Sequence, residues 1–267
     1  LHLLLFAARR FPERKDNPPP TFIFVPAGLI HALVGGLLIL WPLYGFVKLG
    51  NRMVEQGMLL CFIMGIGPYL GGRLLSANAA VSPPRPVPLG IHLLLALSLF
   101  ASFWIESGVS EPAGRSLRAL VVSVHLLRTL PLFHRPARPL WHLRLLWLSF
   151  WFVIVGLCLA GLFPDYEIPA LHLTFIGGFA TLTLTVATRV TAAHCGFEAI
   201  WQKNTKTMFT LALCTLLALI ARVISDFLPF YYFGMLHIGA AFWLTGVAAW
   251  GIVFLPKMSP RRISDEV

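Results

Sequence analysis

Residues 171–196 read LHLTFIGGFATLTLTVATRVTAAHCG. No charged residue lies between Ala170 and Thr188, a length that is about enough to cross the hydrocarbon core of a bilayer as a helix. One helical stripe of this segment carries only small and hydroxyl side chains, at Thr174, Gly178, Thr181, Thr185 and Thr188. Small residues let helices approach closely, and hydroxyls can bond across the contact. We therefore predict a transmembrane helix that faces protein rather than lipid.

The whole chain has the composition of an integral membrane protein. Its 267 residues are 57% hydrophobic and 12% charged, with a mean hydropathy of +0.78. A soluble domain usually carries about 25% charged residues. We predict an all-α fold, a polytopic transmembrane helical bundle that forms a single domain over residues 1–267.

The apolar segments predict about eight spans. They lie near 22–41, 53–71, 88–105, 117–133, 144–163, 169–188, 206–224 and 231–254. The apolar residues 1–8 run directly into Arg9 and Arg10, which is typical of a truncated upstream helix that ends there. A signal-peptide core is the rival interpretation, but its positive charges would lie on the wrong side.

The positive charges predict the orientation of these spans. If the connecting segments alternate between two sides, sixteen of the 21 Lys and Arg residues fall on the side of the N-terminal segment and five on the other. Cytoplasmic loops of membrane proteins are enriched in Lys and Arg. We therefore expect both ends of this chain to be cytoplasmic. The net charge of +10 indicates membrane orientation rather than a nucleic-acid partner.

No catalytic motif of a soluble enzyme occurs in the chain. It has no P-loop, dinucleotide fingerprint, HExxH or nucleophile elbow, and no catalytic acid, base or nucleophile is identified. The four cysteines are widely spaced without a CxxC, so we predict no disulfide framework.

Histidines inside the predicted spans are the main chemical signal. Ionisable groups in a bilayer are costly, so they usually face the bundle interior and have partners. His172 and His237 fall at similar depth toward the non-cytoplasmic side, and a matched pair is what axial haem ligation or a copper site requires. His31 and His125 fall nearer the midplane, and His92 lies near an interface. A hydrogen bond to another side chain is the alternative role for each of them.

Two further groups have simpler expected roles. His134 and His142 flank a basic loop, where we expect them to be solvated or to contact lipid headgroups. Arg222 and Asp226 are four residues apart and could form an ion pair.

Several motifs resemble the NnrS family, polytopic bacterial membrane proteins linked to nitric oxide. The resemblance rests on Leu171–Thr174, Gly177–Gly178, Val186–Val190 and His194–Gly196, with weaker matches at Gly71–Arg73 and Pro139–Trp141. The family is described as carrying haem and copper and typically has about twelve spans, so eight would fit a chain without the N-terminal helices, or a short relative.

The resemblance implies a haem, expected to be b-type, and a copper ion as cofactors. It also implies a bacterial inner-membrane protein that binds nitric oxide or protects metal centres from nitrosative stress. His172, Arg189 and His194 match motif positions. Arg189 could pair with a haem propionate or anchor the interface, and His194 could be a metal ligand or belong to a tight turn.

Two other classes of function stay open at this point. Glycine-broken helices with polar residues near the midplane are compatible with a transporter or permease. The chain could also be a haem-bearing membrane subunit of a respiratory complex, which would imply protein partners, and a homo-oligomer is open too. In every case the lipid bilayer is a partner.

Overall fold

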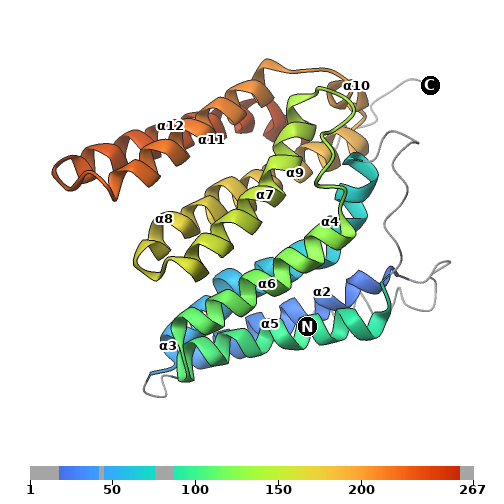
Figure 1. Cartoon of the computed structure of the whole chain (residues 1–267). Coiled ribbons are helices and arrows are strands. Elements are labelled where there is room, and N and C mark those ends of the chain that lie inside the picture. The colour runs from blue at the N-terminus through green and yellow to red at the C-terminus, as the bar shows by residue number, and fades with distance from the viewer. Residues whose placement is uncertain (1–17, 42–44, 76–86, 259–267) are drawn as a thin grey trace.

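The computed structural model describes residues 18–41, 45–75 and 87–258, without the side chains of residues 199 and 200. These residues form a helical bundle (Figure 1). The long helices are α2 (Phe24–Leu40), α4 (Leu59–Leu75), α5 (Leu89–Gly108), α6 (Glu111–Thr129), α7 (Trp141–Leu162), α9 (Thr181–His194), α11 (Lys206–Ser225) and α12 (Tyr232–Phe254). Shorter helices are α3 (Val47–Arg52), α8 (Glu167–His172) and α10 (Glu198–Trp201). The predicted upstream helix at residues 1–8 lies outside the described residues.

Successive long helices run between the same two ends of the bundle (Figure 1). We call these end 1, which holds residues 87–88, 130–140 and 195–205, and end 2, which holds residues 109–110, 163–166 and 226–228. The predicted polytopic helical bundle is thereby confirmed. Seven of the described helical segments are long and apolar enough to span a membrane. The predicted span 117–133 corresponds to α6, which starts six residues earlier and is not among those seven.

The helices form two groups with the same order of packing. In the first group, α2 packs on the continuous helix α3–η2–α4, and α5 packs on α6. In the second group, α7 packs on the continuous helix α8–η4–α9, and α11 packs on α12. Contacts between α6 and α7 join the groups. In each group the second helix contains a π-helical segment, η2 (Met53–Met58) or η4 (Leu173–Ala180). Such segments are rare and occur frequently at functional sites.

The stripe of small and hydroxyl residues on the motif helix is buried, as predicted: Thr174, Gly178, Thr181, Thr185, Thr188. Glycines allow the close approach, because a Cβ at Gly178 would lie only 2.5 Å from the Val153 side chain of α7. The expected bonding across the contact is found only at Thr188, whose hydroxyl accepts a 2.7 Å bond from Trp250 Nε1. The hydroxyls of Thr181, Thr185 and Thr188 also donate to carbonyls of their own helix, whereas the Thr174 hydroxyl is buried without a partner.

Candidate histidine and arginine sites in the bundle

Four histidines are almost completely buried, with exposed fractions of 1–2%: His31, His92, His125 and His142. A neutral imidazole has one N–H donor and one acceptor nitrogen. In each of these rings one nitrogen is buried without a hydrogen-bond partner. A metal-ligating histidine typically donates its other N–H to a carbonyl or carboxylate, which fixes the tautomer and leaves a lone pair for the metal. The four rings can be compared with that arrangement.

His125 on α6 matches the arrangement closely. Its Nε2 lies 2.8 Å from the carbonyl oxygen of Met64 on α4 and donates to it. Its Nδ1, the nitrogen that keeps the lone pair, is buried without a partner. The ring also makes an edge contact with Phe24, with 4.8 Å between the ring centroids. His125 is therefore oriented by the bundle with one free ligand atom.

His92 on α5 lies beside His125, with 5.3 Å between the ring centroids. Both rings line a cavity of about 540 Å³ that also includes Arg128 and Thr129 near end 1. The volume falls in the range of roughly 300–1,000 Å³ that is typical of cofactor and ligand sites. The sequence places His92 near an interface and offers no sign of this pairing, because α5 and α6 bring together two positions 33 residues apart.

His31 on α2 has the same arrangement with the two nitrogens exchanged. Its Nδ1 donates to the carbonyl oxygen of Ala27 at 2.8 Å, and its Nε2 is buried without a partner. The Sγ atom of Cys61 lies 3.6 Å from Nδ1. The ring fits against η2 because residue 57 is glycine, and a Cβ there would overlap the imidazole. The π-helical segment thus packs directly on a candidate ligand.

The prediction that His142 is solvated or contacts lipid headgroups is wrong. Its ring is 1% exposed and packs on the Trp201 indole of α10, with ring centroids 4.0 Å apart. The short helix α10 packs on α9 and places the Trp201 indole against the imidazole. The Arg189 guanidinium lies over the same Trp201 ring, 5.6 Å from its centroid.

His172 is half-buried at the end of α8, and both of its ring nitrogens have partners. Nδ1 donates to the carbonyl oxygen of Ile168 at 2.7 Å, and Nε2 accepts from Arg222 Nε at 3.1 Å. The predicted ion pair between Arg222 and Asp226 is present, at 3.1 Å. The lone pair that would bind a metal is therefore occupied by the Arg222 guanidinium in this arrangement, while ligation by His172 stays a prediction.

The two remaining candidate ligands are exposed. His237 lies on α12, which packs mainly on α11, and its side chain is on the exposed part of the helix. His194 ends α9 and is also exposed. In the described part of the chain, no group of three or more His, Cys, Asp or Glu side chains is placed to hold a metal ion.

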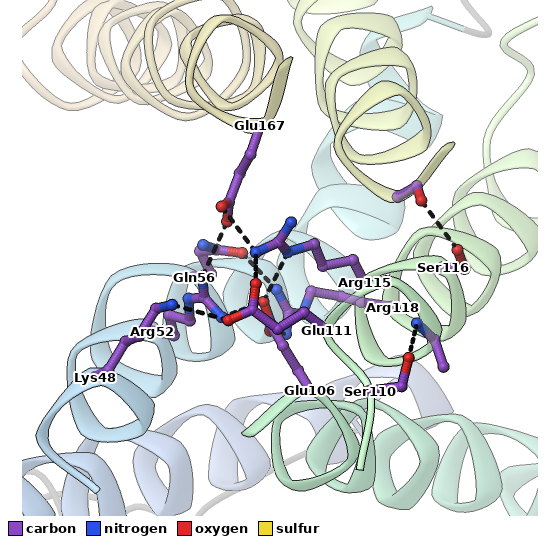
Figure 2. A network of polar contacts seen from close by, with 12 residues as sticks. Lys48, Arg52, Gln56, Glu106, Ser110, Glu111, Arg115, Ser116, Arg118 and Glu167 are labelled. Carbon is purple, nitrogen blue, oxygen red and sulfur yellow. Dashed lines mark hydrogen bonds and ion pairs between the residues drawn. The ribbon is translucent and has the colours of Figure 1, made fainter. Parts of the chain in front are cut away.

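A buried ion network lies at end 2 and was not predicted from the sequence (Figure 2). Its centre is Glu106, whose carboxylate is paired with the guanidinium groups of Arg52, Arg115 and Arg118. The side chains of Glu106, Arg115 and Arg118 are at most 5% exposed. Arg118 also donates to the Gln56 side-chain oxygen of η2 at 2.8 Å. Buried charges require such pairing, because desolvation of each ion costs several kcal/mol.

The network joins the two helix groups. Glu167, at the start of α8, is paired with Arg52 at 3.1 Å and with Arg115 at 2.8 Å. Figure 2 shows Glu167 reaching from its helix toward these guanidinium groups. Arg118 lies 3.7 Å above the Phe103 ring, which in turn packs on His31 with 5.5 Å between centroids. The network therefore contacts both π-containing helices and the surroundings of His31.

The family described as NnrS protein matches residues 1–262, nearly the whole chain. The chain belongs to the NnrS family. Among curated proteins and among solved structures, none is significantly similar to it.

In this NnrS-family protein, the surroundings of four motif residues differ: Gly71, Gly72, Arg73 and Arg189. Gly71 is a packing position, because a Cβ there would lie 3.1 Å from the Phe150 ring of α7. Gly72 has open space around it. Arg73 and Arg189 both lie over aromatic rings, Arg73 at 4.3 Å from the Tyr69 centroid. A ring face attracts a guanidinium electrostatically, so the exposed Arg73 and the half-buried Arg189 each have an aromatic neighbour.

Proposed function

We propose that this NnrS-family protein binds haem in its membrane bundle and takes up nitric oxide there, with His125 as the protein ligand. The observation that carries the proposal is the His125 ring: its Nε2–H is used by the Met64 carbonyl, and its Nδ1 is buried, unpartnered and beside a cavity of about 540 Å³. Haem needs only one histidine to leave a coordination position open for a diatomic ligand. Haem therefore fits this site better than a copper centre with three protein ligands.

The other residues around the cavity have complementary roles in the proposal. His92 can donate or accept a hydrogen bond at the side of His125, or serve as a second ligand. Arg128 lines the cavity at end 1 and offers a guanidinium to a haem propionate. Val87, Ile91, Leu95 and Val124 supply an apolar wall, and such a surround admits a neutral gas that dissolves in the bilayer.

The proposed orientation places end 1 in the cytoplasm of a bacterial cell. The basic segments that flank end 1 support this orientation through the positive-inside rule. The Arg128 side of the cavity then faces the cytoplasmic interface, where propionates can remain hydrated. The ion network would face the non-cytoplasmic side.

The other predicted ligands are part of the same test. His172 would have to release Arg222 before it could bind a metal, and His237 would need a partner outside the described helices. His31 has a free Nε2 and is the second internal candidate. His142, equally buried but next to Trp201, serves as the matched control.

The experiment is the optical spectrum of protein purified in detergent from haem-supplied cells, oxidised and reduced, before and after addition of nitric oxide. Wild type and the variants His125→Ala, His92→Ala, His31→Ala, His172→Ala, His237→Ala and His142→Ala are compared at equal folded amounts. We expect a Soret band that nitric oxide shifts, and loss of at least nine-tenths of it in His125→Ala but not in His142→Ala.

Three results would change the assignment. Loss of the band in His172→Ala or His237→Ala, with His125→Ala unaffected, would move the ligand to those positions. A reduced spectrum that does not respond to nitric oxide would indicate a six-coordinate electron carrier, as in a respiratory subunit. A colourless wild type would refute the proposal and leave transport as the leading function.

A further inference from the structure

A second cavity lies between the two helix groups, away from His125. It is a groove of about 560 Å³ between α4 and α9, with its floor formed by Leu146 and Phe150 of α7. Its size is typical of a site for a small molecule, and such sites occur preferentially where two structural units meet. None of the residues used in the haem proposal lines it.

The groove opens sideways along the spans. Ile66 on α4 and Val190 on α9 line its mouth, and they are 37% and 48% exposed. Thr183 also lines the groove and is exposed. Because α4 and α9 belong to segments long and apolar enough to cross a membrane, the opening lies where lipid would be. The molecules that reach it most readily are those dissolved in the bilayer.

The polarity of the lining changes along the length of the groove. The wall beside Phe62, Phe179 and Val186 is apolar, whereas Thr191, His194 and Cys195 lie at end 1. Phe179 and His194 are fifteen residues apart, which is roughly 22 Å along a helix. The groove therefore suits an elongated molecule with an apolar tail and a polar head at end 1.

The polar end favours a neutral head. Among the residues that the structure describes, no Lys, Arg, Asp or Glu side chain lines the groove. A phospholipid phosphate is bound preferentially by Arg or Lys, so this lining offers it no charge complement. A carbonyl oxygen, in contrast, can accept from the imidazole N–H of His194 or from the hydroxyl of Thr191.

We propose that this groove binds an isoprenoid quinone, with its tail between α4 and α9 and its carbonyl head at His194 and Thr191. The site is independent of the proposed haem cavity and stands even if no haem is bound. It gives a role to His194, a motif residue for which the sequence predicts metal ligation or a turn. The ligand class follows from access through the bilayer, an apolar length of roughly 22 Å and an uncharged polar end.

The test is saturable binding of tritiated decylubiquinone to the full chain in nanodiscs. Thr183→Phe fills the groove from an exposed position, and Leu216→Phe makes a comparable change at an exposed position on α11 outside the groove. We expect about one site per chain in wild type, at least tenfold weaker binding in Thr183→Phe, and unchanged binding in Leu216→Phe. His194→Ala should weaken binding several-fold without affecting folding, because the side chain is exposed.

Competition with added phosphatidylglycerol identifies the head group. The proposal expects that an equal concentration of this lipid leaves quinone binding unchanged. Displacement by the lipid would show a phospholipid site and overturn the assignment. Equal binding by wild type, Thr183→Phe and His194→Ala would also overturn it, and the thermal unfolding midpoint of each variant shows whether it is folded.

Discussion

Neutralising Glu106 should be among the most damaging single changes of charge in this bundle. Its carboxylate is 1% exposed and is the shared partner of Arg52, Arg115 and Arg118. Glu106→Gln keeps the shape of the side chain but leaves three guanidinium groups around a neutral amide. Breaking a buried ion pair by removal of one partner typically costs about 3–5 kcal/mol, because the remaining charge is uncompensated. We expect a loss of stability of that size.

The assay is equilibrium unfolding in mixed micelles, followed by tryptophan fluorescence. Glu111→Gln is the matched control, because Glu111 belongs to the same network and pairs with Arg115, yet its side chain is 48% exposed. Exposed pairs contribute about 0–1 kcal/mol, so this variant should unfold nearly as wild type does. If Glu106→Gln costs no more than Glu111→Gln, the network does not stabilise the contact between the helix groups, and the reasoning is refuted.

Two further predictions concern helix contacts, measured by the same unfolding assay. Gly156→Ala should destabilise the protein by about 1–3 kcal/mol through overpacking, because its Cβ would lie 2.7 Å from the Ala170 carbonyl oxygen. Gly72→Ala is the control and should be neutral or slightly stabilising, because Gly72 has open space around it. Equal effects of the two substitutions would contradict the packing argument. Thr188→Val should cost about 1–3 kcal/mol by leaving the buried Trp250 N–H without its acceptor. Thr183→Val is its control, because that exposed hydroxyl bonds only its own helix, and a similar loss in both variants would count against the cross-helix bond.

The bundle and the protein-facing stripe of the motif helix could be predicted because both depend on local patterns. Apolar length identifies a span, and the spacing of Thr174, Gly178 and Thr181 identifies its buried face. The π-helical segments could not be predicted. Each contains glycine, at Gly57 or at Gly177 and Gly178, but glycine also occurs in ordinary helix contacts.

The ion network could not be predicted for a different reason. The alternation of charges counts Arg115 and Arg118 among the five positive charges of the non-cytoplasmic side, next to the start of the predicted span 117–133, and gives no sign of their partners. Their shared partner Glu106 lies on the preceding helix, and Arg52 lies 54 residues away from it. The carboxylate that neutralises the arginines of α6 is therefore brought next to them only in the folded bundle. The burial of His142 likewise depends on α10, which returns to it from 59 residues later in the sequence.

The haem content of the purified wild-type protein tests the central claim most directly. Full-length protein, expressed in haem-supplied cells and purified in detergent, is assayed for haem by the pyridine haemochrome spectrum and for polypeptide by amino-acid analysis. The proposal predicts about one b-type haem per chain, because the cavity beside His92 and His125 contains a histidine, His125, with a free, oriented ligand nitrogen. Folded protein with a negligible haem content would contradict it.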